Sequence, residues 1–129
     1  MMNYQDFVFT LTSKPSKDLN ALVTRMWDIE DTFNVAMLAT TGLGLASEAG
    51  EYAEVVKKIL FQGKEPSEEN IFHMKRELGD ILFYFTLACI LLHTDINEIE
   101  EMNREKLSAR YNELVFSVKN SENRKPGDI

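Results

Sequence analysis

The stretch ELGDILFYFTLACILL, residues 77–92, combines two features that decide how the chain folds. It begins with two acids three residues apart, Glu77 and Asp80, and from Ile81 to Leu92 it is apolar nearly all round. Such a composition is typical of a fully buried helix. Positions i and i+3 share one face of a helix, so the two acids point toward whatever this helix packs against.

A second phrase of the same design lies upstream. In Glu48-Ala49-Gly50-Glu51, two acids again stand three residues apart with a glycine before the second, inside an apolar stretch with helical spacing. One such pair is normally a solvated helix face, but acids among apolar residues are costly unless they are paired or bound to metal. If the two helices face each other, four carboxylates converge, and their pKa values rise or a cation joins them.

An all-oxygen set of donors suits a hard divalent ion such as Mg²⁺ or Mn²⁺. We therefore predict a metal site in which the ligands are Glu48, Glu51, Glu77 and Asp80. The glycines in these helices are also compatible with close helix packing, which would bring the acids together. A di-iron site is disfavoured because no Glu-x-x-His occurs, and zinc is disfavoured because there is no cluster of histidine and cysteine. We interpret His73 and His93 as structural or exposed.

Hydrophobic periodicity predicts an all-α fold, an antiparallel bundle of about four to five helices completed by oligomerisation. We expect Asp18 and Ser67 to be N-caps and Gly63 to be a C-terminal cap. Gly42 and Gly44 cost a helix roughly 1 kcal/mol each relative to alanine, so a kink or break is expected there. Five helices are expected. The first covers residues 3–12, and the second follows residue 18. The third runs from 31 or 32 to about 60, the fourth from 67 to about 93, and the fifth from 94 or 95 to about 116. Residues 1–116 are expected to form one domain, and the polar residues 117–129 a mobile tail.

Composition limits the classes of function. The chain has 129 residues, 44% of them hydrophobic, and a formal charge of −7, so its overall electrostatics oppose nucleic-acid binding. No apolar run reaches the ~18 residues of a membrane span, and the N-terminus lacks the basic and apolar segments of a secretory signal. With one cysteine, Cys89, these features favour the cytoplasm. Trp27 is read as a core or interface aromatic, with base stacking as the alternative.

Basic and polar side chains gather on one face of the last expected helix. Asn103, Lys106 and Arg110 are spaced by three and four, so they share a face suited to phosphate oxygens, although ordinary pairing with nearby acids is an alternative. Lys57 and Lys58 follow the first acidic phrase by two turns and offer further donors. A carboxylate metal centre beside a basic face is similar to machinery for phosphoryl transfer.

These motifs together resemble the MazG-like all-α nucleoside triphosphate pyrophosphohydrolases over residues 35–112. The resemblance rests on the two acidic phrases 25 residues apart, on Phe61-Gln62-Gly63-Lys64, and on the closing segment NREKLSARY, residues 103–111. It implies Mg²⁺-dependent cleavage of a (d)NTP to the monophosphate and pyrophosphate, in a homodimer or homotetramer whose sites are completed by a neighbouring subunit.

The resemblance also implies roles for individual residues. The four acids would bind metal, and Glu48 or Glu51 would be the catalytic base. Lys57, Lys106 and Arg110 would meet the phosphates, with Asn103 and Tyr111 near the nucleotide. The sequence leaves two alternatives open, a narrower enzyme for dUTP, dCTP or an alarmone such as ppGpp, and a non-catalytic helical oligomer that binds a structural ion.

Overall fold

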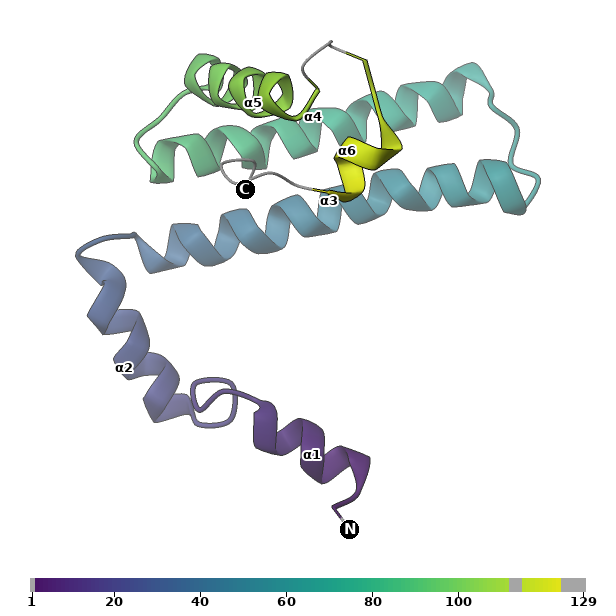
Figure 1. Ribbon diagram of the computed structural model, residues 1–129. Coiled ribbons are helices and arrows are strands. Elements are labelled where there is room, and N and C mark those ends of the chain that lie inside the picture. The colour runs from purple at the N-terminus through teal and green to yellow at the C-terminus, as the bar shows by residue number, and fades with distance from the viewer. Residues whose placement is uncertain (1, 112–114, 124–129) are drawn as a thin grey trace.

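The computed structural model describes residues 2–111 and 115–123, and these residues form helices and no strand (Figure 1). The all-α prediction is therefore confirmed. The helices, in chain order, are α1 (Tyr4–Leu11), α2 (Leu19–Glu30), α3 (Val35–Phe61), α4 (Glu68–Leu91), α5 (Ile96–Arg110) and α6 (Val118–Glu122).

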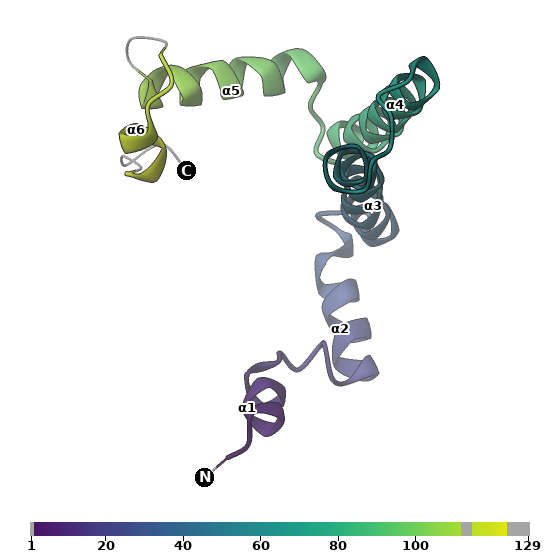
Figure 2. The ribbon, with the colours of Figure 1, turned by 90° about the vertical axis from the view of Figure 1, so that its right-hand side faces the viewer.

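The long helices α3 and α4 run antiparallel, side by side, and form the central hairpin of the fold (Figures 1 and 2). Their ends carry the expected signals. Gly63 adopts a φ of 69° in the connecting loop, and the Lys64 N–H donates to the carbonyl of Lys58 at 3.1 Å. The Ser67 hydroxyl accepts from the Asn70 N–H at 3.3 Å, which makes it the N-cap of α4. The start of α3 differs from the expectation, because the Asn34 side chain accepts from the Met37 N–H and delays the helix to Val35.

Helix α3 continues without interruption through Gly42 and Gly44, so the expected break does not occur. Gly44 is buried, and a Cβ built on it would lie 2.3 Å from two ring carbons of Tyr84 on α4. A Cβ on Gly42 would have nothing within 4 Å. Gly44 therefore permits the close approach of the two helices, as the packing interpretation of these glycines suggests.

The C-terminal helices differ from the expectation. We expect one helix to about Phe116, but α5 ends at Arg110, and α6 lies where a polar tail is predicted. The Asn120 side-chain amide of α6 donates to the carbonyl of Arg110 at 3.1 Å, so α6 caps the end of α5. Sequence periodicity gives no information on a contact between separate helices such as this one. Residues 124–129 of the expected tail lie outside the described residues.

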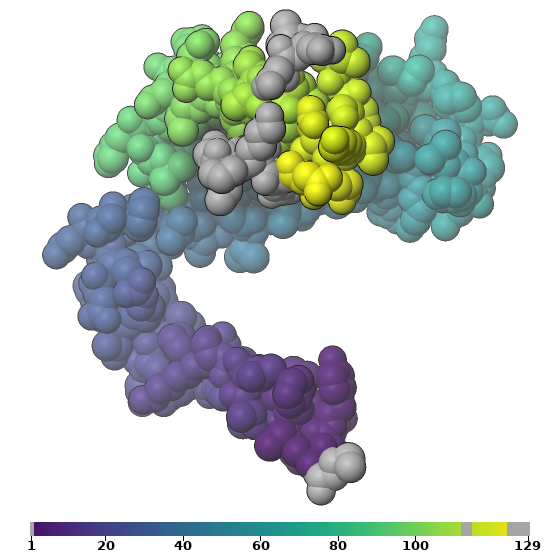
Figure 3. Space-filling view, viewed as in Figure 1, coloured from purple at the N-terminus to yellow at the C-terminus, as the bar shows by residue number. Residues whose placement is uncertain are grey.

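The single chain buries few apolar side chains and exposes a large surface. Among the described residues, the buried apolar side chains are Val35, Val55, Cys89 and Leu91. The exposed surface is 10567 Å², whereas a compact monomer of this mass is expected to expose roughly 7,000 Å². The N-terminal helices form an arm that extends away from the hairpin (Figure 3), and α5 leaves α4 at 94° (Figure 2).

The apolar half of α4 is only partly covered within one chain. Phe83 is 62% exposed and Ile90 is 58% exposed, while Cys89 and Leu91 are buried. In the described part of the chain, no individual helix has the length and apolar composition to cross a membrane. The bent pair of α4 and α5 meets that test together, on length and composition alone.

The contact between Gly44 and Tyr84 gives a prediction with a matched control. We expect Gly44→Ala to lower the free energy of unfolding by about 1–3 kcal/mol, because the added methyl group overpacks against the ring. Gly42→Ala should raise it by up to about 1 kcal/mol, because it improves helix propensity in open space. Urea denaturation of both variants at one protein concentration measures the difference, and equal effects of the same sign would contradict the assigned packing.

Candidate metal centre

Three of the four predicted acids converge. Glu48 and Glu51 on α3 and Glu77 on α4 each offer a carboxylate oxygen, and these three oxygens lie within 4.8 Å of one another. The antiparallel hairpin explains the meeting, because it places the middle of α3 beside the first half of α4. Glu77 is buried, Glu48 is half-buried and Glu51 is exposed, so the cluster opens to solvent on one side.

Asp80 lies outside this group of three. It is exposed, one turn after Glu77 on α4. Its negative charge nevertheless acts on Glu48, so it belongs to the same electrostatic environment. Asp80 is therefore an exposed candidate for a fourth ligand.

The cluster raises the pKa of the Glu48 carboxyl above its ordinary value. Loss of hydration is the larger cause, followed by the negative charges of Glu51, Asp80 and Glu77. A divalent cation among these carboxylates would remove the repulsion. Without a cation, the folded chain holds these negative charges together at neutral pH at a cost in stability.

His73 joins the cluster from the preceding turn of α4. Its Nε2 lies 2.7 Å from Oε1 of Glu77, and its side chain is 47% exposed whereas that of Glu77 is 7% exposed. The sequence interpretation of His73, as structural or exposed, gives it no role beside the acids. The signal that could have found it is the spacing of four between His73 and Glu77, which places both on one helix face.

The lysines of α3 face an acid of their own helix. Glu54 lies 3.1 Å from Nζ of Lys58 and 3.8 Å from Nζ of Lys57. The hydrogen bond from Lys58, then its charge and that of Lys57, lower the pKa of the Glu54 carboxyl. Both pairs are exposed, and surface ion pairs of this kind contribute little to stability, so Lys57 can exchange Glu54 for another anion at low cost.

The residues predicted to meet the nucleotide lie on α5, which turns away from the hairpin (Figure 2). Asn103 and Lys106 are exposed, and Arg110 and Tyr111 are half-buried at the far end of this helix. The structure of one chain therefore does not bring them to the acidic cluster.

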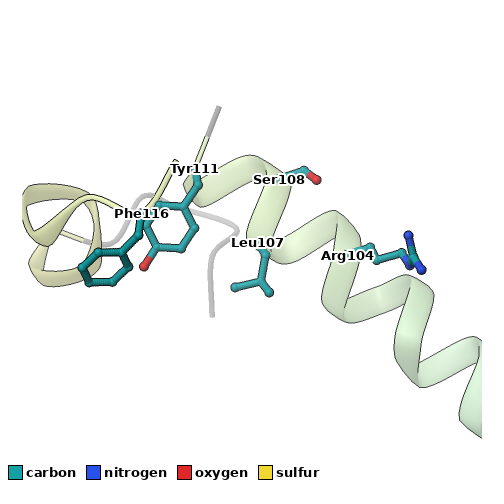
Figure 4. Close-up of a pocket in the computed structure, with 5 residues that line it drawn as sticks. All are labelled: Arg104, Leu107, Ser108, Tyr111 and Phe116. Atoms are coloured by element: carbon teal, nitrogen blue, oxygen red, sulfur yellow. The ribbon is translucent and has the colours of Figure 1, made fainter. Parts of the chain in front are cut away.

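Among the hollows that the described residues line, two contain residues singled out in the sequence analysis. The first has a volume of about 500 Å³. It runs along α5, where the rings of Tyr111 and Phe116 are 5.7 Å apart (Figure 4). The residues that line it are Arg104, Leu107, Ser108, Tyr111 and Phe116.

The second hollow, of about 380 Å³, lies between α2 and the start of α3. Trp27 lines it and is 74% exposed. Trp27 is therefore not a core residue within one chain. An interface role and a base-stacking role both stay compatible with its position.

The raised pKa of Glu48 gives a prediction for protein treated with a chelator. An unfolded glutamate titrates at about pH 4.3, and the folded group titrates at a higher pH. As pH rises through this interval, the unfolded state releases its proton first, so the folded state loses relative stability, and the loss is complete above the folded pKa. We expect Glu48→Gln to raise the melting temperature at pH 7 and to leave it unchanged below about pH 4. A pH series of thermal melts measures this, and no gain at pH 7 would contradict it.

Comparison with known proteins assigns this hairpin to a family. The profile of the MazG nucleotide pyrophosphohydrolase domain matches residues 37–115, more than half of the chain. The Gene 37 protein of Mycobacterium phage L5 is 33% identical over 82 residues, which cover 62% of this chain and 71% of that protein. No solved structure matches the chain. The chain belongs to the family of the MazG nucleotide pyrophosphohydrolase domain.

Proposed function

We propose that this protein is a Mg²⁺-dependent nucleotide pyrophosphohydrolase that cleaves a (d)NTP to the (d)NMP and pyrophosphate. The observation that carries the proposal is the meeting of Glu48, Glu51 and Glu77 across the hairpin, with their oxygens within 4.8 Å of one another. Membership of the family supplies the reaction class, and the cluster supplies a place for its metal.

The donor set fits a hard divalent cation. All three ligand atoms are carboxylate oxygens, which Mg²⁺ and Mn²⁺ prefer over softer donors. Oxygens bound to one Mg²⁺ at about 2.1 Å lie at most about 4.2 Å apart, so small side-chain rotations bring this cluster to binding distance. Glu48, Glu51 and Glu77 would hold the ion, with Asp80 as the fourth ligand.

Individual residues of the chain then have separate roles in hydrolysis. Bound Mg²⁺ supplies neutralisation of the triphosphate and a lowered pKa for the attacking water. Glu48 or Glu51 accepts the proton of that water as its oxygen attacks the α-phosphorus, and pyrophosphate leaves. Lys106 and Arg110 carry positive charge for the phosphates, and Lys57 adds a further donor once it leaves Glu54. Asn103 and Tyr111 lie at the nucleotide.

A second copy of the chain would complete the site. The acids lie on α3 and α4, whereas the predicted phosphate-binding residues lie on α5, which diverges from them. The surface of 10567 Å², set against the roughly 7,000 Å² of a compact monomer, leaves several thousand Å² for contact with a partner. A homodimer or homotetramer that covers α4 and brings α5 to the acids of a neighbour accounts for both features.

Two other functions would use the same cluster. A narrower enzyme for dUTP, dCTP or ppGpp differs only in what surrounds the base, for which the hollow beside Trp27 and that beside Tyr111 are candidate places. A non-catalytic oligomer would keep the metal and lack turnover. The presence of all four acids favours an enzyme, because the loss of one of them would have favoured a structural ion.

A panel of canonical and modified (d)NTPs and ppGpp with Mg²⁺ tests the reaction. We expect pyrophosphate and not orthophosphate as the product, and we expect Glu51→Gln or Asp80→Asn to abolish turnover because each removes a ligand charge and keeps the shape of the side chain. Melting temperatures measured with chelator should hold or rise in both variants, since repulsion among the acids falls. Release of orthophosphate, or full activity in either variant, would count against the proposal.

Mixing two impaired variants tests whether α5 acts on a neighbouring copy. Lys106→Ala should lower kcat/KM on the order of ten- to a hundred-fold, as expected for a lost charged hydrogen bond. When this chain is co-expressed with Glu51→Gln, mixed oligomers should regain activity, because one site then receives intact acids from one chain and an intact Lys106 from the other. Light scattering should show a dimer or larger assembly.

A second mixture provides the control. Glu51→Gln co-expressed with Glu77→Gln should regain no activity, because both acids belong to the hairpin of a single chain. No recovery in the first mixture would show that α5 serves the acids of its own chain. Recovery in the control would show that Glu51 and Glu77 of one site come from different chains.

A further inference from the structure

Glu77 differs from the other acids of the cluster in its burial. It is 6% exposed, whereas Glu51 is exposed and Glu48 is half-buried. A buried carboxylate is costly unless it is hydrogen-bonded. The partner that satisfies Glu77 is His73, whose Nε2 lies 2.7 Å from Oε1 of Glu77.

We propose that His73 is a positioning residue that holds the Glu77 carboxylate in the orientation in which it binds the divalent ion. This inference rests on the proposed metal site and adds to it a residue that is neither one of the four acids nor one of the basic groups. Carboxylates that bind a metal are commonly hydrogen-bonded by neighbouring residues, and these hydrogen bonds affect metal affinity.

The geometry of α4 accounts for the pairing. His73 and Glu77 are four residues apart, so both side chains lie on one face of α4. An ionised carboxylate only accepts hydrogen bonds, so Nε2 of His73 donates. One oxygen of Glu77 is then engaged, and its second oxygen and remaining lone pairs are left for the cation.

The competing explanation is that the pair only stabilises the helix. Pairs four residues apart occur elsewhere in the described residues, as between Glu54 and Lys58 and between Glu100 and Arg104. Those pairs are exposed at both ends, with 68% exposure for the Arg104 side chain and 56% for Glu100. The pair of His73 and Glu77 is the one among these whose acid is buried and belongs to the metal cluster.

Binding of Mn²⁺ to the full chain, followed by the electron paramagnetic resonance signal of the free ion at about pH 8, tests the assignment. We expect His73→Ala to weaken Mn²⁺ binding about tenfold. This is the low end of the range for residues that hydrogen-bond a metal ligand, because the His73 ring is half-exposed. His73→Gln should recover much of the affinity, because its amide can donate to the same carboxylate. Arg104→Ala, which removes a pair of the same spacing away from the acids, should leave the affinity unchanged.

The melting temperature without metal gives a second measurement that separates the two explanations. If the pair only stabilises the helix, His73→Ala and Arg104→Ala should lower the melting temperature alike and leave the Mn²⁺ affinity of folded protein intact. That result would overturn the positioning role. Should His73→Ala fail to fold, His73→Gln compared with His73→Leu provides the same contrast between a hydrogen-bond donor and an apolar side chain.

Glu77→Gln separates failure of this inference from failure of the proposed function. If Glu77→Gln binds Mn²⁺ as the wild type does, the metal site itself is wrongly assigned. If Glu77→Gln loses affinity and His73→Ala keeps it, the metal site stands and the role of His73 falls. Electron spin echo modulation should show no directly bound imidazole nitrogen, and its detection would make His73 a ligand and overturn the positioning role.

Discussion

The close approach of α3 and α4 at Gly44 is the constraint on which the rest of the structure depends. The ring of Tyr84 occupies the space where any other residue would carry a Cβ. In an antiparallel pair, each step forward on one helix matches a step back on the other. Glu48 stands one turn after Gly44, and Asp80 stands one turn before Tyr84. The contact therefore fixes both the spacing and the register that bring the two acidic phrases face to face.

This register creates an electrostatic conflict that the protein alone does not resolve. Burial and the neighbouring charges of Glu51, Asp80 and Glu77 disfavour the ionised form of Glu48. His73 satisfies one oxygen of Glu77, the most buried of the acids. A hydrogen bond of this kind satisfies one acceptor but does not cancel the charge of four carboxylates. The conflict is the physical reason to expect a cation, and it makes the packing at Gly44 part of the chemistry.

Local signals in the sequence predicted the parts of the fold that local forces determine. Asp18 and Ser67 cap their helices as expected, and Gly63 adopts the left-handed conformation of a C-terminal cap. The acidic phrases were predicted to meet, and three of the four acids do so. The end of α5 was not predictable in this way, because its last carbonyl is capped by Asn120 from another helix. Likewise, the spacing of His73 and Glu77 gave no sign that the acid would be buried.

Periodicity identifies an apolar face but not what covers it. The segment after Asp80 has the composition of a buried helix, yet Phe83 and Ile90 are more than half exposed within one chain. In the same single chain, α5 extends away from the hairpin that carries the acids. The proposed assembly would account for both observations. An assembly that buries α4 would remove its apolar side chains from water, which lowers the free energy of the assembly. If the same assembly also brings a neighbour's α5 over the acids, the free energy gained from that burial offsets the repulsion among the carboxylates of the metal site.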